Sequence, residues 1–356
     1  MSDFVAVGDL HLTTPGPKGT VRGGLSAYIK DHDQFVISLV RNQVLRYAKK
    51  NYIKDVVFLG DICEGTRLSY EAQLALLHLL QGSQFRFHFI LGNHDLFGAD
   101  PSLGHSLQLL KAIGLPNVHI YESVTDTEIA NGIPVRFLPW PHAKFSKSRL
   151  NIAHVDVAGA KMDSGRTVED EKANSSNATA IIGHIHGNQQ VRNSYFAGTL
   201  YQTSFGESIE KFFHHVRYED GQFDIENVAV KPVYKLHSVE VASKKDLREV
   251  PRSEFDLVKL ILLPGSKITA DDYKYINVKK IRATTTERDL ALARVEDLMS
   301  GSEVNISTDE FFAEWLRNQT ARRDLKVRAF KLRRKLLKGH HDRKETKGDR
   351  NTQAHI

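Results

Sequence analysis

The sequence predicts an α/β protein with a folded core, and two observations favour this class. Short apolar runs rich in Val, Ile, Leu and Phe alternate with stretches of helical periodicity through the first half of the 356-residue chain. Within each run the apolar residues occupy successive positions, which is typical of strands buried on both faces of a sheet. Hydrophobic residues make up 41% of the chain and charged residues 26%, as in soluble globular proteins.

Five apolar runs contain or end in a cluster of polar residues, mostly with glycine, and each is expected to be a strand followed by a loop. They are FVAVGDLH, DVVFLGDIC, FHFILGNHD, LNIAHVDV and TAIIGHIHG. Helices are expected between them over 32–51 and 70–81, where apolar residues recur at helical spacing, with Gly82 ending the second. Because strand–helix–strand order places functional loops at strand ends, the five clusters are expected along one edge of a sheet.

The second half of the chain changes character. Residues 159–178 are polar and aperiodic, which predicts a loop. Residues 232–286 predict a small α+β unit, with strands over 234–243, 255–265 and 278–286 and a helix over 269–276. The expected organisation is a core over 1–230, a small domain over 231–300, C-terminal helices over 301–340 and a disordered tail over 341–356.

The net charge of +6 is unevenly distributed along the chain. Residues 320–350 hold 13 Lys and Arg against 4 Asp and Glu, a balance of +9, so the rest of the chain has a balance of −3. This basic segment includes a predicted amphipathic helix over 321–339. Its apolar stripe consists of Leu325, Ala329, Leu332 and Leu336. The stripe predicts packing against a partner or against the protein's own core.

The single cysteine and the apolar pattern indicate a cytoplasmic protein. Cys63 excludes an internal disulfide, fits a reducing compartment and is expected to be buried beside a strand. No apolar run approaches the ~18–20 residues that a membrane span needs, so no membrane association is expected. The opening MSDFVAVGDLHL does not resemble a secretory signal.

The five clusters together predict a centre for two metal ions. They supply seven oxygen and imidazole donors: Asp9, His11, Asp61, Asn93, His154, His184 and His186. Singly, each cluster also suits an ordinary turn or a buried structural histidine, and it is their joint occurrence that favours a site. A donor set without thiolates suits Mn, Fe or Zn, and seven donors suit two ions that share a carboxylate.

Charge counting favours catalysis over structural metal binding. Two divalent ions carry four positive charges, and Asp9 and Asp61 are the anionic donors, which leaves a surplus of two. A phosphodiester and a hydroxide would neutralise this surplus. Glycines precede four of the donors and allow the backbone to turn sharply beside the ions.

The pattern GDLHL, GDICEG, GNHD, AH and GHIHG, spanning residues 8–187, resembles the calcineurin-like metallophosphoesterase superfamily. The segment YFAGTLYQTSFGE, the small domain that follows it and the basic C-terminal region resemble the SbcD-type DNA repair and recombination nucleases, with bacteriophage recombination endonucleases as the nearest members. The resemblance implies a four-layer α/β/β/α core, a capping domain that engages DNA, and two divalent ions, with Mn the first expectation and Mg, Fe or Zn as alternatives. A phage-encoded member would act in the host cytoplasm.

The resemblance also implies a role for each donor. One ion would be held by Asp9, His11 and His186, the other by Asn93, His154 and His184, and Asp61 would bridge the two. His94 would face the scissile phosphate as acid or transition-state donor, and Asp95 would orient it. The nucleophile would be a hydroxide bridging the ions, acting in endonuclease or exonuclease cleavage.

Two departures from the family pattern concern substrate contacts. Glu64 stands three residues after the expected bridging aspartate, where many relatives carry His or Asp. The chain also inserts residues 13–24 after GDLHL, as a DNA-contacting loop or a longer surface turn. The candidates for substrate contact are Glu64, Arg67, Lys18 and Arg22.

The family further implies partners. An SbcC-type coiled-coil ATPase would dock on the C-terminal helices, for which the stripe Leu325, Ala329, Leu332 and Leu336 is the candidate contact. The rival interpretation is that this basic helix packs on its own core or contacts DNA phosphates. A homodimer is also expected.

Two other function classes compete with a nuclease. The first is a phosphatase or nucleotide phosphodiesterase of the same superfamily. Ser/Thr protein phosphatases carry GDxxDRG and GNHE where this chain has GDICEG and GNHD, so that class is disfavoured. The second is a scaffold that has lost catalysis, which is disfavoured because every ligand position and His94 are filled.

Overall fold

The computed structural model describes residues 2–13, 25–98, 103–163, 165–169 and 178–284. The chain divides into two units, Met1–Ser302 and Glu303–Ile356, and all described residues belong to the first. The insert from residue 14 onward, the C-terminal helices, their apolar stripe and the tail therefore lie outside the described residues. The predicted division into domains stays a prediction.

The first sheet carries three of the five predicted strands. It has the order β12-β11-β1-β2-β3-β4, and β1 to β4 run parallel. Its strands are β1 (Ser2–Val7), β2 (Asp55–Phe58), β3 (Arg86–Ile90), β4 (Val118–Tyr121), β11 (Lys211–Glu219) and β12 (Gln222–Val230). The β11–β12 hairpin joins β1 in antiparallel fashion and closes that side of the sheet.

The second sheet carries the other two predicted strands, in the order β5-β6-β7-β8-β10-β9. Its strands are β5 (Thr125–Ile129), β6 (Ile133–Leu138), β7 (Leu150–Ala153), β8 (Ala180–Ile182), β9 (Gln189–Val191) and β10 (Ser194–Phe196). The middle strands β6, β7, β8 and β10 are parallel, and β5 and β9 pair with the sheet antiparallel.

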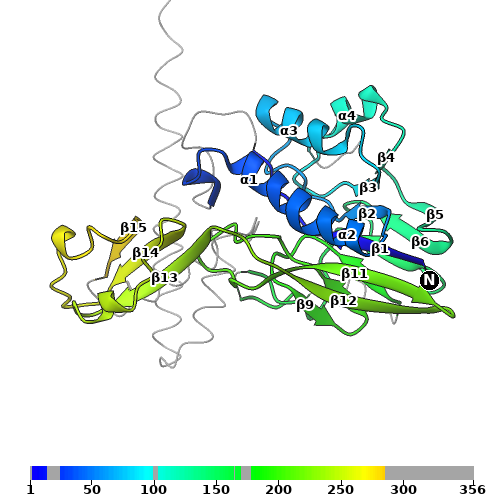
Figure 1. Cartoon of the computed structure of the whole chain (residues 1–356). Helices are drawn as coiled ribbons and strands as arrows, with labels where there is room; N and C mark the ends of the chain where they lie inside the picture. The colour runs from blue at the N-terminus through cyan, green and yellow to red at the C-terminus, as the bar shows by residue number, and fades with distance from the viewer. Residues whose placement is uncertain (1, 14–24, 99–102, 164, 170–177, 285–356) are drawn as a thin grey trace, which may run out of the picture. The chain divides into compact units, whose positions relative to one another are not determined.

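The helices lie together on one side of the first sheet (Figure 1). The helix predicted over 32–51 is α1 (His32–Leu39), a π-helical stretch (Val40–Leu45) and α2 (Arg46–Lys50); α3 is Tyr70–Leu80, α4 is Gln108–Ile113, and a 3-10 turn spans Leu25–Ala27. Ser69 caps α3 by accepting a hydrogen bond from the Ala72 backbone N–H at 3.0 Å. Within the described part of the chain, every helix is too short or too polar to span a bilayer.

The sequence of β1 shows why successive residues are apolar. Val5 and Val7 pack in the core beneath the helices, whereas Phe4 and Ala6 pack in a second core with residues of β6 and β7. Since alternate residues of a strand point to opposite faces, both faces of the first sheet are buried, one by helices and one by the second sheet. The α/β class and the stacked sheets are thereby confirmed.

The outer face of the second sheet is covered by loops among the described residues. Val155, Val157 and Ala160 are buried there against β7, β8 and β10. A helical fourth layer is not found within the ranges that the structure describes. The segment predicted as a loop over 159–178 has no helix or strand in its described positions, 159–163, 165–169 and 178.

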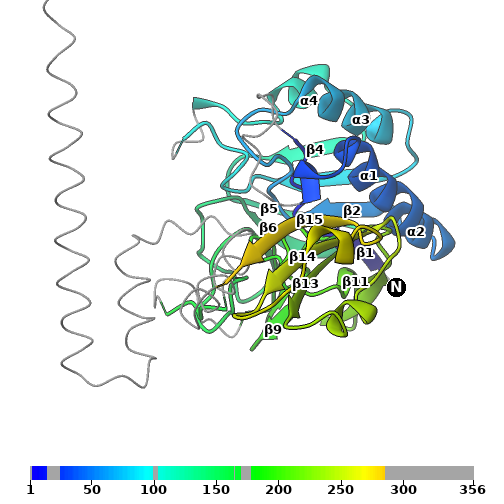
Figure 2. The same cartoon turned by 90° about the vertical axis from the view of Figure 1, so that its left-hand side faces the viewer.

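The region after β12 forms a separate three-stranded parallel sheet (Figure 2). Its strands are β13 (Lys235–Val241), β14 (Asp256–Leu262) and β15 (Val278–Ala283), as predicted. The helix predicted over 269–276 is wrong: only a 3-10 turn, Ala270–Asp272, forms there. Thr269 and Asp272 make a capping box around that turn, and the chain then leaves helical geometry at Tyr273 to enter β15.

Candidate metal centre

The five polar clusters meet at one place, where the carboxyl ends of two sheets adjoin. Loops after β1, β2 and β3 come from the first sheet, and loops after β7 and β8 come from the second. The prediction that all five lie along one sheet edge is therefore wrong, although their convergence is observed. The physical reason is that β7 and β8 pair with β6 and β10, and the two sheets stack face to face.

Glycine is required where the loops pass closest to one another. A Cβ on Gly92 would lie 2.0 Å from Oδ1 of Asp61, and one on Gly183 would lie 2.3 Å from the carbonyl oxygen of Leu59. Distances this short exclude any side chain at these two positions. The glycines therefore let two loops approach the donors on which the site depends.

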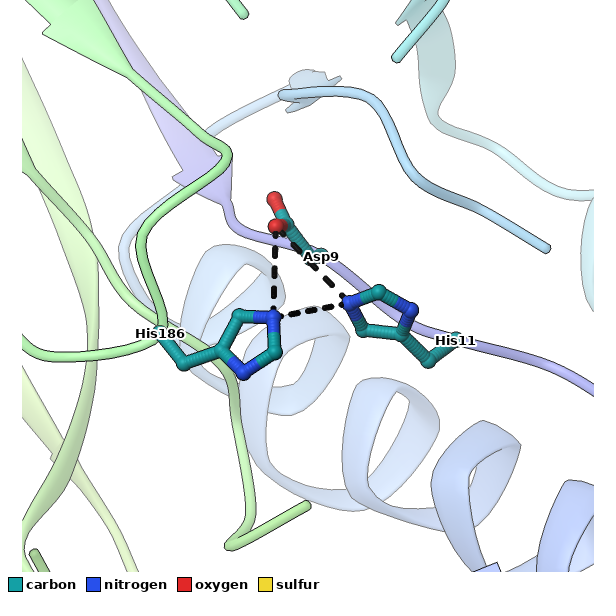
Figure 3. A group of neighbouring side chains, drawn as sticks. All are labelled: Asp9, His11 and His186. Carbon is teal, nitrogen blue, oxygen red and sulfur yellow. Dashed lines mark hydrogen bonds and ion pairs between the residues drawn. The ribbon is translucent and has the colours of Figure 1, made fainter. Parts of the chain in front are cut away.

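The first ligand cluster joins the ends of β1 and β8 (Figure 3). Nε2 of His11 and Nε2 of His186 are 3.0 Å apart, and they lie 3.9 and 4.0 Å from Oδ2 of Asp9. All three side chains are buried. Two imidazole nitrogens and a carboxylate oxygen converging in a buried space form a donor set for a transition-metal ion.

The second ligand cluster consists of Asp61, His154 and His184, with the amide of Asn93 between the histidines. Oδ2 of Asp61 lies 3.2 Å from Nε2 of His154. Oδ1 of Asn93 lies 3.0 Å from Nε2 of His154 and 3.0 Å from Nδ1 of His184. The clusters adjoin, because the backbone N–H of His184 donates to Asp9 at 3.1 Å. The structure thus brings together all seven predicted donors.

Both clusters favour positive charge. Burial lowers the pKa of His154, but Asp61 and Asp9 outweigh it and raise the pKa to about 9. Burial likewise lowers the pKa of His186, and Asp163, Glu207 and Asp9 raise it to about 10. Carboxylates therefore make each cluster a place where a cation is stabilised, which is the electrostatic condition for divalent ions.

Sequence comparison identifies the family. The family model described as Calcineurin-like phosphoesterase matches residues 3–188, which include every one of the converging loops. The chain belongs to the calcineurin-like phosphoesterase family. It is accordingly a metal-dependent phosphoester hydrolase whose cofactors are divalent metal ions, and the donor set just described fits them.

Two individual proteins align with parts of this chain. The protein named "Putative phosphoesterase 078R" of Invertebrate iridescent virus 3 is 23% identical over 241 residues, which cover 61% of this chain and 69% of that protein. The solution NMR structure of Thermotoga maritima protein TM1076 aligns with 12% identity and a TM-score of 0.27, over 65% of this chain and all of that one.

Each histidine of the phosphoesterase site is contacted at the ring nitrogen that faces away from the centre. Nδ1 of His154 is 2.7 Å from the carbonyl oxygen of Leu59, which can only accept, so this nitrogen carries the proton. Nδ1 of His186 lies 3.2 Å from Oδ2 of Asp163 and 3.3 Å from Oε1 of Glu207. With the proton held on Nδ1, a bound ion would displace the proton from Nε2 and take up the lone pair that is directed into the clusters.

The other two histidines repeat the pattern with a carboxylate. Nε2 of His184 lies 3.2 Å from Oδ1 of Asp156, while its Nδ1 faces Asn93. Nδ1 of His11 lies 2.9 Å from Oε2 of Glu64. All four histidines therefore have an oxygen within 3.3 Å of the ring nitrogen opposite to the centre, in hydrogen bonds for His154 and His186 and in ion-pair contacts for His184 and His11.

Glu207 joins the first cluster to a buried ion pair. Its carboxylate lies 2.6 Å from Nζ of Lys211 and accepts hydrogen bonds from the backbone N–H groups of Thr203 and Ser204 at 3.1 Å each. Burial raises the pKa of Glu207, but the Lys211 ammonium and then His186 outweigh it and hold the pKa well below the usual range. Glu207 is thus ionised and can hold the His186 proton.

Three residues of this outer set were not predicted: Asp156, Asp163 and Glu207. Asp156 lies two positions after His154 in AHVDV, a spacing that could have indicated it. Glu207 lies in SFGES, and Asp163 lies in the polar segment predicted as a loop, where no local pattern distinguishes it. Their contacts with His184 and His186 depend on the tertiary fold.

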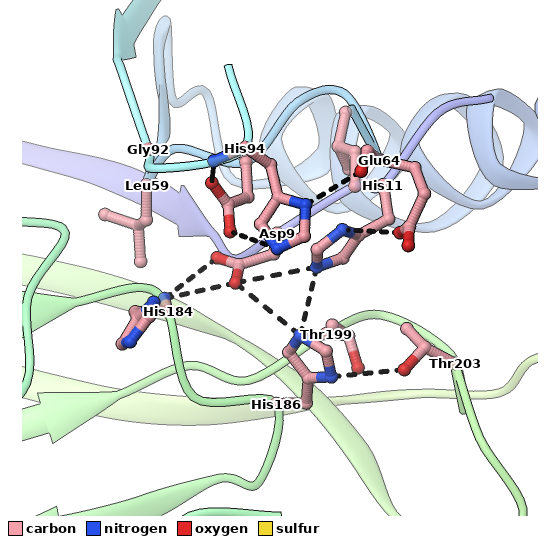
Figure 4. A network of polar contacts seen from close by, with 12 residues as sticks. Asp9, His11, Leu59, Glu64, Gly92, His94, His184, His186, Thr199 and Thr203 are labelled. Carbon is pink, nitrogen blue, oxygen red and sulfur yellow. Dashed lines mark hydrogen bonds and ion pairs between the residues drawn. The ribbon is translucent and has the colours of Figure 1, made fainter. Parts of the chain in front are cut away.

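His94 lies beside both clusters (Figure 4). Its backbone N–H donates to Oδ1 of Asp61 at 2.9 Å, and its Nε2 lies 3.9 Å from Oδ2 of the same residue. Its Nδ1 donates to the backbone carbonyl of Glu64 at 2.8 Å. The ring is therefore oriented by a main-chain oxygen, with Nε2 on the side of Asp61.

The Asp95 carboxylate binds main-chain N–H groups. This corrects the prediction that Asp95 orients the His94 ring. Its buried carboxylate accepts hydrogen bonds from the backbone N–H groups of Ile62, Cys63 and Gly92 at 3.3, 3.1 and 3.0 Å, and from the Ser106 hydroxyl at 2.8 Å. Asp95 thereby fastens the loop after β2 to the loop after β3. Cys63, in that loop, is buried as predicted, and burial raises the pKa of its thiol.

Of the predicted substrate contacts, Glu64 and Arg67 are described. Arg67 is exposed, with its guanidinium 5.5 Å from the centre of the Phe97 ring. Glu64 faces His11, as above. Lys18 and Arg22 lie in the insert, outside the described residues.

Proposed function

We propose that this phosphoesterase is a two-metal-dependent DNA nuclease. The observation that carries the proposal is the adjoining pair of ligand clusters with His94 beside them. Two divalent ions bound there would polarise a phosphoryl oxygen and supply a nucleophile from water at neutral pH. Two adjoining clusters suit in-line displacement at one phosphorus, with no covalent protein intermediate.

The side chains of the chain itself perform three tasks in this mechanism. Asp9, Asp61 and Asn93 supply the oxygen donors that would hold the ions among the imidazoles. His94, held through Nδ1, presents Nε2 as proton donor to the leaving oxygen or as a hydrogen-bond donor to the developing charge. Asp95 keeps the loops that carry Asp61 and His94 at a fixed separation.

DNA is proposed as substrate because of charge and resemblance. The segment 320–350, with its local balance of +9, would bind phosphates without sequence preference, and the exposed Arg67 would add a phosphate contact. The resemblance to SbcD-type nucleases supports roles in recombination, repair or DNA-end processing. This basic segment is the main argument against a nucleotide phosphodiesterase.

The test is hydrolysis of end-labelled single- and double-stranded DNA with Mn²⁺ or Mg²⁺. Cyclic nucleotides and bis-p-nitrophenyl phosphate serve as comparison substrates in the same buffer. The expected result is Mn²⁺-dependent cleavage of DNA that is at least as efficient as cleavage of the small diesters. Efficient hydrolysis of nucleotides together with inert DNA would overturn the nuclease proposal and favour the phosphodiesterase.

We also propose that the chain acts with an SbcC-type ATPase that docks on residues 301–340. The sequence basis is the stripe Leu325, Ala329, Leu332 and Leu336, in a segment that is predicted to be a basic helix. Truncation after residue 305 is expected to abolish association with the ATPase while Mn²⁺-dependent cleavage of single-stranded DNA survives. Association of the truncated chain with the ATPase would contradict this proposal. A homodimer remains a prediction that sedimentation of the full chain tests.

A further inference from the structure

Glu64 contacts two residues of the site, and it does so through different groups (Figure 4). Its carboxylate Oε2 lies 2.9 Å from Nδ1 of His11. Its backbone carbonyl accepts from Nδ1 of His94 at 2.8 Å. Glu64 therefore contacts Nδ1 of His11, a predicted metal ligand, and Nδ1 of His94, the predicted proton donor.

The backbone of Glu64 is fixed relative to His11 before the side chain is considered. Its N–H donates to the carbonyl oxygen of Leu12 at 2.8 Å, and the Leu12 N–H donates to Ile62 at 2.9 Å. The backbone N–H of His11 donates to Asp61 at 3.0 Å, so the loops after β1 and β2 run side by side. The carboxylate consequently reaches His11 from a rigid position.

The surroundings of Glu64 favour a role toward His11 over one toward substrate. The His11 side chain is 4% exposed and that of Glu64 is 26% exposed, so most of the Glu64 side chain is shielded from solvent. A carboxylate aimed at a phosphodiester would repel it, because both carry negative charge. The other three histidines each have an oxygen within 3.3 Å of the outward nitrogen, and Glu64 places one at 2.9 Å from that nitrogen of His11.

We propose that Glu64 is a positioning residue that holds the proton on Nδ1 of His11 and thereby directs Nε2 toward Asp9 and His186. Its carbonyl group fixes the ring of His94 in the same manner, so that the spacing between the metal ligand and the proton donor is set by a single residue. The inference rests on the proposed metal centre and is independent of whether DNA is the substrate. It replaces the expectation that Glu64 contacts substrate.

The test measures metal binding and histidine tautomers in the full-length protein without nucleic acid. Calorimetric titration with Mn²⁺ is expected to show one of two ions binding roughly 10–100-fold more weakly in Glu64→Ala. Glu64→Gln is expected to bind more tightly than Glu64→Ala and more weakly than the unaltered protein, because its amide oxygen still accepts from Nδ1 but carries no charge. Glu71→Ala, an exposed glutamate at the start of α3, is the matched control and should leave both affinities unchanged.

Nitrogen NMR of the metal-free protein separates positioning from a general structural effect. In Glu64→Ala the His11 signal is expected to shift toward a mixture of tautomers, whereas His94, which is held by the backbone carbonyl, keeps its Nδ1 proton. Should Glu64→Ala fail to fold, Glu64→Asp shortens the side chain by one methylene and is expected to weaken the same ion.

Two outcomes would overturn the proposal. In the first, Glu64→Ala retains both ion affinities and the His11 tautomer but changes KM for bis-p-nitrophenyl phosphate, which makes Glu64 a substrate contact. In the second, the unaltered protein binds a third ion that Glu64→Ala loses, which makes Glu64 itself a ligand together with His11 and His94.

Discussion

The two ligand clusters differ in what holds their histidines from behind. In the first, His11 and His186 face the carboxylates of Glu64, Asp163 and Glu207, and Glu207 is tied to a buried ammonium. In the second, the buried His154 is held by a backbone carbonyl at the end of β2, and His184 faces a partly exposed carboxylate. The first cluster therefore depends on distant charged side chains, whereas the second depends more on the ends of the strands.

The largest effect is expected from removing the residue that serves both the second cluster and His94. Asp61→Asn replaces a carboxylate 3.2 Å from His154 with a neutral amide. Hydrolysis of bis-p-nitrophenyl phosphate is expected to fall roughly 1,000-fold or more, with loss of one bound ion. Metal analysis and kcat at saturating Mn²⁺ test this. Full activity in Asp61→Asn would mean that the clusters work separately.

The next effect concerns His94, which lies beside the clusters without belonging to either donor set. His94→Ala is expected to lower kcat by roughly 100- to 10,000-fold and to leave both bound ions in place. Metal content by atomic emission together with steady-state kinetics tests this. An unchanged rate would remove His94 from the mechanism, and loss of an ion would make it a ligand.

The difference between the two clusters is tested by altering, in each cluster, one carboxylate that contacts the outward nitrogen of a histidine. Glu207→Gln is expected to lower the affinity for the ion at the first cluster roughly 10–100-fold, and Asp156→Asn is expected to lower the affinity only at the second cluster. Glu207→Gln also leaves the buried Lys211 unpaired, at a cost of about 3–5 kcal/mol of folding stability, whereas Asp156→Asn has no such cost. Calorimetry and urea unfolding measure the two quantities.

A matched double variant separates the two effects of Glu207. Glu207→Gln combined with Lys211→Met removes both charges. The free energy of unfolding should therefore partly recover, while the affinity for the ion at the first cluster stays low. Equal losses of affinity at both ions in Glu207→Gln would show that the outer carboxylates do not act cluster by cluster.

The smallest effect concerns a buried histidine that no carboxylate supports. His214 on β11 lies between the sheets, and burial lowers its pKa to about 4, with Asn227 offsetting part of this. Because the folded pKa is below the unfolded value, stability is full above about pH 6.5 and declines as pH falls toward 4, by about 3 kcal/mol in total. Urea unfolding at pH 7 and 4.5 should show a smaller decline in His214→Leu; an equal decline would contradict the assignment.

Sequence reasoning located the strands and the donors that lie in local motifs. Runs such as FVAV and DVVF are apolar at every position because both faces of their sheet are buried, and this pattern is legible without a structure. The motif residues were found because each follows its strand directly. The helix predicted over 269–276 failed because a Thr-Ala-Asp-Asp start resembles a helix cap, and only the chain's return to β15 ends it after one turn.

The residues that sequence reasoning missed are those whose role depends on distant parts of the chain. Asp163 and Glu207 lie 23 and 21 positions from His186 and carry no motif of their own. Glu64 was noticed as a departure from the family pattern, but its partner was not predictable, because the contact with His11 requires the loops after β1 and β2 to run side by side.

The sequence by itself therefore determined the α/β class, the positions of the seven candidate donors and the family, since strand burial and the polar cluster at each strand end are local properties. The tertiary structure decided that two sheets contribute to the centre, that Asp95 holds backbone, and that carboxylates stand behind His11, His184 and His186. The physical reason is that these features depend on which strands pair and how the sheets stack. Distances between side chains remote in sequence follow from that stacking alone.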